Sequence, residues 1–412
     1  MRKILIISTV TFFIILAIFL GWYLFLRNPS IPAGEVIRNS LPFGSRDNTD
    51  VPFSPIGDTG NSTEELAPFD EFDAPAANLF RLSENPVAGT IVIKRGNQAV
   101  ARYVDRATGH IYDVLLPTGA SSTLPERVKV TNNTLPKIYE AYFRSDGNTV
   151  LLRFLKDDSD VVENLSLTLT SPRSTSTLYA VSSTILRGDI GSVAPGPGNT
   201  LFYVLRDTSS IVSSAFNGTG LRTLLTSVFN DWRLSVAGNN LVTYTKASAN
   251  VSGYAYTLNI SNGTLTKILG PLNGLVALSN SSGNRVLYSY VENNRTKLFA
   301  KNLANNIFSE ILPTTIAEKC LWSSRDAGML FCGAPIDGLK TGEPDSWYRG
   351  KTHFSDRIWL FDTNIDIAQV LIEPKQSLGI DIDVSEPRLS PDEDYLIFIN
   401  KTDLSLWALK LR

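Results

Sequence analysis

The stretch AYFRSDGNTVLLRFL, residues 141–155, decides the fold. A short apolar run, a tight turn at Gly147 and a second apolar run are typical of a β-hairpin, because glycine readily adopts the positive φ that such turns need. Related hairpins recur along the chain, with their turns at Gly96, Gly147, Gly198, Gly238, Gly283, Ala327 and Glu393. The turns lie 40 to 66 residues apart, which is mostly the period of a repeat fold built from small sheets.

A third apolar run follows each hairpin. These runs begin at residues 110, 164, 210, 254, 297, 357 and 405. A fourth run is weaker but visible in two units, as ERVKVTN at 126–132 and AQVLIEP at 368–374. Four antiparallel strands per unit, repeated seven times, predict an all-β fold, a seven-bladed β-propeller over residues 78–412.

The two ends of this region predict how the ring closes. The last unit has only three apparent strands before the sequence stops at Arg412, and residues 78–84 (NLFRLSE) form a strand-like piece before the first unit. We expect residues 78–84 to pair as the outer strand of the last blade. That pairing would remove an exposed sheet edge and hold the ring shut.

The N-terminal segment indicates a membrane anchor. Residues 4–26 form an uncharged run of 23 residues, which spans about 34 Å as a helix, against about 30 Å for a hydrocarbon core. Arg2 and Lys3 precede it, which favours a cytoplasmic N-terminus. A cleaved signal peptide is the alternative, but its apolar region is shorter and ends in small residues. We expect residues 1–27 to be a single-pass anchor with the propeller outside the cytoplasm.

Residues 28–77 read as a linker. Prolines recur in this segment, and acids gather toward its end at Glu64, Glu65, Asp70, Glu71 and Asp73. Proline removes backbone donors and like charges repel, so we expect a disordered, extended and solvated tether between the bilayer and the propeller.

Composition argues against several kinds of site. The formal charge is −2, and Lys and Arg do not cluster after residue 3, so nucleic acid is not an expected partner. The two histidines, His110 and His353, are far apart in sequence, and we expect no metal and no cofactor. Residues 333–341 nearly spell a phosphate loop, and residues 362–373 nearly spell a calcium loop. Leu339 and Ile367 stand where those motifs need other residues.

Cys320 and Cys332 are the only cysteines, and they lie symmetrically about the turn near Asp326. This spacing places them opposite each other on adjacent strands, with Cβ atoms about 4.5–5.5 Å apart. An oxidising compartment would favour a disulfide. Two buried free thiols are the alternative.

The sixth unit carries an insertion at residues 334–355 (APIDGLKTGEPDSWYRGKTHFS), on the face where the blades are linked. Aromatic and arginine side chains often anchor interfaces. The candidate partner-binding residues are Trp347, Tyr348, Arg349, Lys351, His353 and Phe354. The alternative is that the aromatic side chains pack on their own blade. No residue of the chain is assigned a catalytic role.

The segment SPDEDYLIFINKTDLSLWALKL, residues 390–411, resembles the WD40-like repeats of TolB-type propellers. The resemblance covers about residues 89–412, although the third to fifth units lack the Pro-Asp pair. Unlike TolB-type proteins, this chain shows no separate α/β domain before the repeats. The resemblance implies a bacterial envelope protein that binds other envelope proteins, and it carries over no catalytic residue.

These features predict a membrane-tethered extracytoplasmic propeller that acts as a scaffold in the cell envelope. We expect it to contact the bilayer through residues 4–26 and to bind a protein or a cell-wall glycan on its loop face. The sequence does not favour an enzyme. One alternative is a carbohydrate-active or other hydrolytic propeller with carboxylates at the channel mouth. Another is a purely structural spacer.

Overall fold

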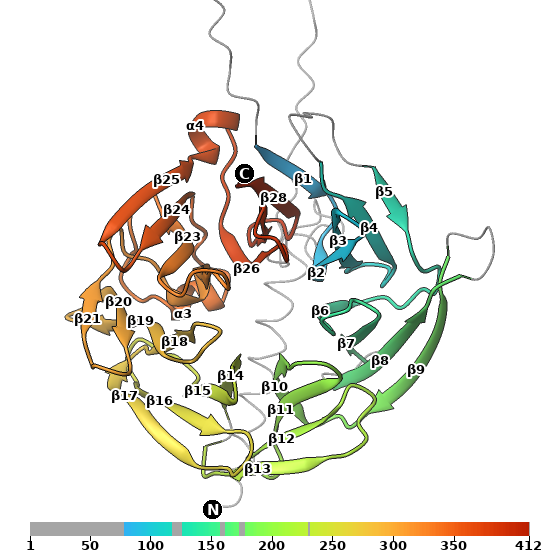
Figure 1. Cartoon of the computed structure of the whole chain (residues 1–412), viewed down its shortest axis with the longest axis horizontal. Helices are drawn as coiled ribbons and strands as arrows, with labels where there is room; N and C mark the ends of the chain where they lie inside the picture. The colour runs from blue at the N-terminus through green and yellow to red at the C-terminus, as the bar shows by residue number, and fades with distance from the viewer. Residues whose placement is uncertain (1–77, 118–125, 157–160, 173–177, 230, 412) are drawn as a thin grey trace, which may run out of the picture. The chain divides into compact units, whose positions relative to one another are not determined.

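The computed structural model describes residues 78–117, 126–156, 161–172, 178–229 and 231–411. In this part of the chain, seven four-stranded antiparallel sheets stand as blades around a common axis (Figure 1). The prediction of an all-β, seven-bladed propeller is therefore confirmed. The expected membrane segment and linker lie outside the described residues. Within them, no helix has the length and apolar character needed to span a membrane.

We number the blades 1 to 7 from the first hairpin. The inner strands are β2 (Val87–Arg95), β6 (Ile138–Phe143), β10 (Ile190–Pro195), β14 (Trp232–Ala237), β18 (Val276–Ser279), β22 (Cys320–Trp322) and β26 (Val384–Leu389). The second strands are β3 (Gln98–Asp105), β7 (Thr149–Leu155), β11 (Thr200–Leu205), β15 (Asn240–Thr245), β19 (Arg285–Glu292), β23 (Met329–Pro335) and β27 (Tyr395–Asn400).

The third strands are β4 (Ile111–Leu115), β8 (Val162–Thr170), β12 (Ser210–Ala215), β16 (Ser252–Asn259), β20 (Arg295–Asn302), β24 (Asp356–Asp362) and β28 (Leu406–Lys410). The outer strands are β5 (Arg127–Lys129), β9 (Ala180–Leu186), β13 (Arg222–Thr226), β17 (Leu265–Asn273), β21 (Phe308–Glu310), β25 (Ile367–Ile372) and β1 (Leu79–Ser83). Among the described residues, the helical elements are η1 (Ala317–Lys319), α3 (Asp345–Tyr348) and α4 (Pro374–Leu378).

The predicted hairpin turns join the inner and second strands of each blade. All five turn glycines have φ between 57° and 74°, the left-handed region that glycine adopts without strain. Glu393 takes φ 56° in the last blade, and its carboxylate accepts hydrogen bonds from Ser323 and Ser324 in the turn of blade 6. The seventh turn therefore tolerates a larger residue because its side chain links two blades.

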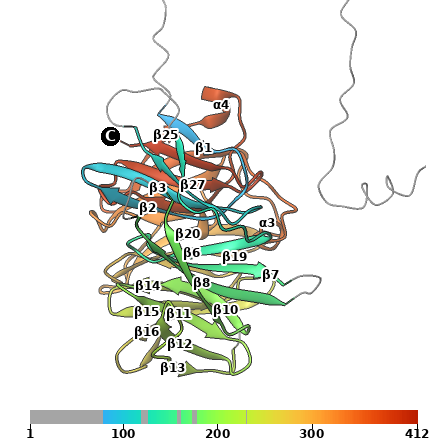
Figure 2. The same cartoon turned by 90° about the vertical axis from the view of Figure 1, so that its right-hand side faces the viewer.

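The blades present two different faces, which Figure 2 shows from the side. The turn face carries the hairpin turns between inner and second strands. The opposite loop face carries the connections between second and third strands and the links between blades. Leu79 pairs with Leu409, at the turn-face end of β28, so the chain enters the propeller on the turn face.

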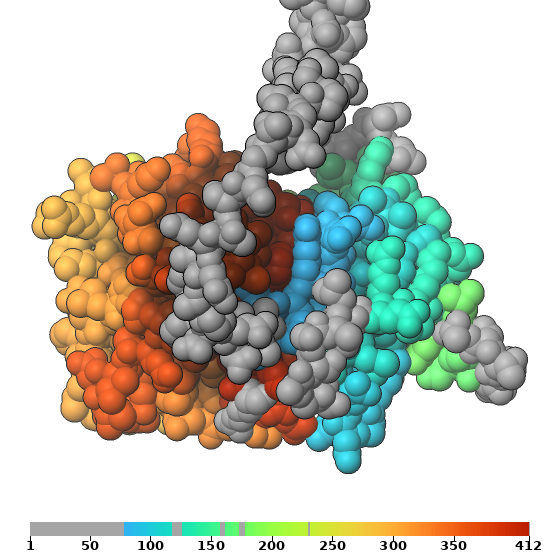
Figure 3. All heavy atoms as spheres, turned by 90° about the horizontal axis from the view of Figure 1, so that it is seen from above, coloured from blue at the N-terminus to red at the C-terminus, as the bar shows by residue number. Residues whose placement is uncertain are grey.

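The ring is closed by the two ends of the described region. β1 pairs antiparallel with β28, with Phe80 opposite Ala408 and Arg81 opposite Trp407. Figure 3 shows the blue N-terminal residues of the ring directly beside the dark-red C-terminal ones. Phe80 packs in a buried cluster that joins blade 7 to Val92 and Tyr103 of blade 1. The closing strand therefore supplies both backbone pairing and core.

Adjacent blades approach closely at some positions. A Cβ atom on Gly89 of blade 1 would lie 2.1 Å from the carbonyl oxygen of Ala141 in blade 2. A Cβ on Gly333 of blade 6 would lie 2.5 Å from the Cβ of Val384 in blade 7. Glycine is required at both positions because any larger residue would force the blades apart.

We expect Phe80→Ala to lower the free energy of unfolding by about 3 kcal/mol, because it removes a buried ring from the contact that closes the propeller. Urea denaturation of the full chain in detergent measures this effect. Glu84→Ala is the control, since Glu84 is exposed just beyond the same strand. Equal losses in the two variants would contradict the closing role of β1.

Candidate functional site

The insertion of blade 6 folds as a loop on the loop face, between β23 and β24. The backbone N–H of Ile336 donates to the carbonyl of Ser355 at 2.8 Å and closes its base. The loop contains the short helix α3. Within this helix, the backbone N–H of Trp347 donates to the buried carboxylate of Glu343 at 2.8 Å. The segment is thus an ordered element of blade 6.

A buried ion cluster fixes this loop to blades 6 and 7. The Lys319 ammonium lies 2.8 Å from Asp356 Oδ2 and also contacts Asp383, and all three side chains are fully buried. The Trp347 indole N–H donates to the carboxylate of Asp383 at 3.0 Å. The Lys319 Nζ lies 5.2 Å from the Trp347 ring centroid and 5.1 Å from that of Phe354. The cation is therefore satisfied by two carboxylates and two aromatic faces.

Burial changes the acid–base behaviour of this cluster. Removal from water raises the pKa of Asp356 to about 6, although the neighbouring Lys319 acts in the opposite direction. One oxygen of Asp356 accepts a hydrogen bond from the backbone N–H of Val384 at 2.7 Å, whereas its Oδ1 is buried without a partner. The cluster is a structural element whose charge is costly to bury.

The structure separates the candidate residues of the insertion into two groups. Trp347 and Phe354 are buried in the ion cluster, so the packing alternative holds for these two. Arg349, Lys351 and His353 are exposed, and Tyr348 is half-buried. The outward-facing part of the candidate site therefore begins at Tyr348 and Arg349.

The tip of the insertion reaches across to blade 4. Asp345 of α3 accepts hydrogen bonds from Ser248 Oγ at 3.0 Å and from the backbone N–H of Ala249 at 2.6 Å. Beside it, Tyr244 of β15 donates to Glu318 at 2.8 Å. Burial beside Glu318 raises the pKa of both Tyr348 and Tyr244, so the two phenols stay neutral. Blade 4 and the insertion of blade 6 are thus joined by hydrogen bonds to Asp345.

A pocket of about 540 Å³ opens between these two blades on the loop face. Its lining residues are Val228, Phe229, Asp231, Thr245, Lys246, Ala247, Ser248, Val251, Asp345, Tyr348 and Arg349. Its volume is in the range of sites that hold a small ligand or a side chain. Two candidate residues predicted from the sequence, Tyr348 and Arg349, therefore lie in one site with residues of blade 4.

Apolar side chains at the rim of this pocket are unusually open to solvent. Val228 is 92% exposed, Val251 is 58% exposed and Phe229 is 43% exposed. The Phe229 ring packs edge-on against Trp232, with centroids 5.5 Å apart, so it is held in place. Exposed apolar groups gathered at a pocket are typical of a binding surface.

The charged side chains of the pocket differ in whether they are already paired within the protein. Asp345 is engaged by blade 4 and by Arg349, whose guanidinium lies 3.5 Å away. Lys246 and Asp231 remain as charges at the rim. The lining contains no histidine or cysteine, and no metal-binding group of acids, histidines or cysteines occurs among the residues that the structure describes. The arrangement suits recognition of an apolar group with charged neighbours.

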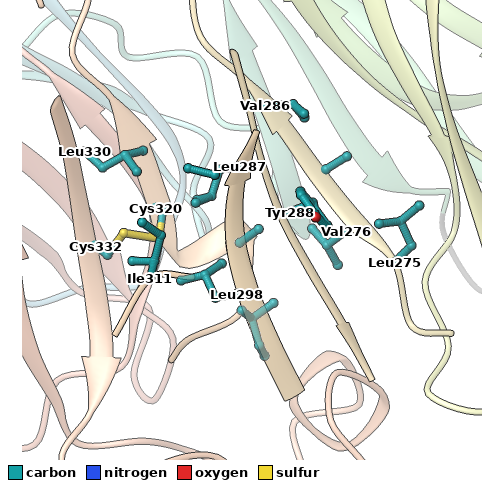
Figure 4. Packing of buried hydrophobic residues seen from close by; sticks show 14 of the residues in the cluster. Leu275, Val276, Val286, Leu287, Tyr288, Leu298, Ile311, Cys320, Leu330 and Cys332 are labelled. Atoms are coloured by element: carbon teal, nitrogen blue, oxygen red, sulfur yellow. A yellow bond between two sulfur atoms is a disulfide. The ribbon is translucent and has the colours of Figure 1, made fainter. Parts of the chain in front are cut away.

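The two cysteines form a disulfide within blade 6. Cys320 on β22 and Cys332 on β23 are direct partners in the strand register, with Cα atoms 4.0 Å apart. Figure 4 shows the bond packed among Leu330, Ile311 and Leu287. Both residues are buried, so the disulfide belongs to the core beneath the insertion.

Several site residues had no recognisable signal in the sequence. Lys319 and Asp383 look like ordinary charged residues before a strand. Phe229 lies in the link between blades 3 and 4, and Val251 lies in a connection of blade 4, both far along the chain from the insertion. The adjacent apolar pair Val228 and Phe229 is the available indication in the sequence.

These observations define a seven-bladed propeller with a pocket on its loop face. No protein-family model and no curated protein sequence matches this chain. Among solved structures it is similar to TolB from Acinetobacter baumannii, with 11% identity and a TM-score of 0.41, over 66% of this chain and 63% of that one. The match thus spans less than two thirds of that TolB chain.

Two lyases show a similar likeness of fold. The chain is 12% identical to streptogramin B lyase, with a TM-score of 0.48, over 81% of this chain and 97% of that one. It is 8% identical to an oligogalacturonate lyase in complex with manganese, with a TM-score of 0.47, over 79% of this chain and 97% of that one. These similarities concern the fold alone.

We expect Lys319→Met to lower the free energy of unfolding by about 3–5 kcal/mol, because it leaves two buried carboxylates without their cation. Lys351→Met is the matched control, since Lys351 is exposed in the same insertion. Adding Asp356→Asn and Asp383→Asn to Lys319→Met should recover part of the loss. A loss no larger than that of the control, measured by urea denaturation, would contradict the role of the cluster.

The pH dependence of stability should carry the signature of Asp356. Its folded-state pKa of about 6 lies above its ordinary value of 3.8, so between these values the folded state holds a proton that the unfolded chain releases. The stabilisation of the folded state that comes from this bound proton is complete below pH 3.8 and is lost as the pH rises through about 6. Unfolding of the wild type and of Asp356→Asn, followed across this window, should differ in slope. If the free energies of unfolding of the two proteins changed in parallel with pH, Asp356 would not be the source of this pH dependence.

Proposed function

We propose that this protein is a membrane-tethered binding scaffold of the cell envelope, whose loop-face pocket holds an apolar side chain of a partner protein. The observation that carries the proposal is the exposure of Val228, Phe229 and Val251 around a pocket of about 540 Å³. Burial of this apolar surface by a partner would be favourable at about 25 cal/mol per Å².

The rim chemistry favours a protein partner over a glycan. Val228 and Val251 are branched aliphatic side chains, which offer neither a hydrogen bond to a hydroxyl nor a flat surface. They match a leucine, methionine or aromatic side chain of a partner. Tyr348 and Arg349 supply the residue types that anchor protein interfaces.

The path of the chain leaves the loop face accessible to a partner. The chain enters the propeller at Leu79 on the turn face, and the pocket lies on the opposite loop face. The point of attachment therefore leaves the pocket free. The tether itself is a proposal that rests on the uncharged run at residues 4–26.

One observation favours a hydrolase as the second candidate. Glu386 projects from a distorted part of β26, with φ 48°, and its side chain is accessible to solvent although protein surrounds it. This enclosure raises the pKa of Glu386, as a general acid requires. The neighbouring Glu140, however, is bound by Arg153 at 2.6 Å and by Tyr142 at 3.1 Å. Loss of glycan turnover in Glu386→Gln would support the hydrolase.

Site-specific photocrosslinking tests the binding function. A benzophenone side chain at position 228 of the full chain, in its native membrane, should crosslink to one partner protein. The same group at Ile185, which is 74% exposed on the outer strand of blade 2, is the control and should give no such product. Val251→Asp should reduce the product about tenfold, because it places a charge in the apolar rim.

Thermal unfolding should be unchanged in Val251→Asp, since this side chain is mostly exposed. Equal crosslinking at positions 228 and 185 would argue against the pocket as the binding site. A product that consists of glycan instead of protein would redirect the proposal to the cell wall.

A further inference from the structure

One lysine and two aspartates form a group that is closed off from water where blade 6 meets blade 7. Lys319 ends η1, Asp356 begins β24, and Asp383 directly precedes β26. All three side chains are fully buried. The Lys319 Nζ lies 2.8 Å from Asp356 Oδ2 and also contacts Asp383 Oδ1. The group is not part of the lining of the proposed partner pocket.

The absence of water makes the contact between Lys319 and Asp383 a reactive one. The buried rings of Trp347 and Phe354 lie over the Lys319 Nζ and cover the group. Transfer of one proton from the ammonium to the touching carboxylate removes two charges from surroundings that solvate them poorly. The result is a neutral amine, which is a nucleophile, in contact with a neutral carboxyl group, which is an electrophile.

Hydrogen-bond donors mark Asp383 as the carboxyl group that is attacked. Its Oδ2 accepts the Trp347 indole N–H at 3.0 Å and the backbone N–H of Phe354 at 3.2 Å, while its Oδ1 contacts Lys319. Two N–H donors on one oxygen stabilise the negative charge that develops there when a nucleophile attacks the carbon. Asp356 has no such pair, since its Oδ1 is buried without a hydrogen-bond partner among the described residues.

Asp356 lies where a proton carrier is needed. Its Oδ2 is 2.8 Å from the Lys319 nitrogen, which is within the reach of direct proton transfer. Burial raises the pKa of Asp356 to about 6, so near neutral pH this carboxyl group can both accept a proton and return it. The nucleophile, the electrophile with its two donors and the proton carrier therefore meet in one dry site.

We propose that Lys319 and Asp383 react with each other to form an isopeptide bond, an amide between their side chains that joins blade 6 to blade 7. The reaction needs no other reactant, and one water molecule is its second product. In the structure the amine and the carboxylates are separate groups in contact, which is the arrangement that precedes the bond. The inference is independent of the proposed binding function.

The protons and electron pairs of the reaction balance within the group. The Lys319 ammonium first gives one proton to Asp383 Oδ1. The nitrogen lone pair then attacks Cγ, and the C=O electron pair moves onto Oδ2, where the two N–H donors hold it. Asp356 takes a second proton from the nitrogen and delivers it to Oδ1. The bond between Cγ and Oδ1 breaks as the C=O bond forms again, water leaves, and the third proton stays on the amide nitrogen. Asp356 is unchanged at the end.

The bond would also affect stability. It would tie the end of η1 to the segment before β26 and so prevent the ring from opening between blades 6 and 7. Lys319→Met removes the bond together with the cation, so the loss of stability expected for that variant has the same sign before and after the reaction.

Peptide mapping of the full-length protein, purified from membranes and reduced, tests the proposal. Trypsin does not cleave after an acylated lysine, so residues 302–325 and 376–388 should appear as one branched peptide. Its mass should be lower, by one water, than the sum of the two peptides. Fragmentation should place the branch between Lys319 and Asp383.

Two results of this map would overturn the proposal. Recovery of residues 302–319 and 376–388 as separate, unmodified peptides from folded protein would show that the bond does not form. A branch to residues 352–357, which contain Asp356, would show that Asp383 is not the carboxyl group attacked. The map of the wild type decides the existence of the bond whether or not any variant folds.

A variant tests the role of Asp356. The yield of the branched peptide at a fixed time after synthesis should fall about tenfold or more in Asp356→Asn, because the proton carrier is lost. Thermal unfolding shows whether the variant is folded, and a wild-type yield in the folded variant would overturn this role. Asp381→Asn is the matched control and should leave the yield unchanged. Asp381 lies in the same tryptic peptide and pairs with Lys375 at 3.0 Å, but both side chains are exposed.

Discussion

Each blade of this propeller is a small sheet with two apolar faces, and both faces have to be covered by neighbours. An open row of seven such sheets would leave two faces exposed, so the fold depends on the pairing of β1 with β28. Side chains reinforce the joints. Arg102 of blade 1 donates to the carbonyl of Gly147 in blade 2 at 2.8 Å, and Arg153 of blade 2 donates to that of Ile190 in blade 3.

Closure of the ring also explains the position of the candidate site. Because the inner ends of the blades converge on the axis, a single insertion from blade 6 can reach blade 4 through Asp345. Its base needs a rigid support, which the buried Lys319 cluster supplies. Hydrophobic residues would provide stability at less desolvation cost. A buried ion set with fixed hydrogen-bond geometry has the further effect of holding the Trp347 indole in one orientation.

The sequence predicted the regular part of this architecture well. Repeated glycine turns, third strands and the strand-like piece at residues 78–84 all follow from local patterns, and the symmetric cysteines are direct strand partners. The outer strand β21 has three residues and no recognisable pattern, whereas β5, which is equally short, lies within the predicted run at residues 126–132. The pocket could not be predicted, because Phe229 and Arg349 meet only after the blades assemble. The sequence indicated Trp347 as a partner-binding residue. It gives no sign that Trp347 is buried, because the carboxylate of Asp383, which accepts the indole N–H, lies 36 residues away along the chain.

The loop face carries a feature that a folded protein ordinarily avoids. Apolar side chains around its pocket are exposed to water, with Val228 92% exposed and Val251 58% exposed. This exposure adds little to the stability of the isolated propeller, because exposed valines bury little apolar surface. It becomes favourable when a partner brings an apolar side chain to the same place. The pocket is lined from blades 4 and 6, which Asp345 joins by hydrogen bonds, so these side chains are held at one place, and this supports the proposed binding role.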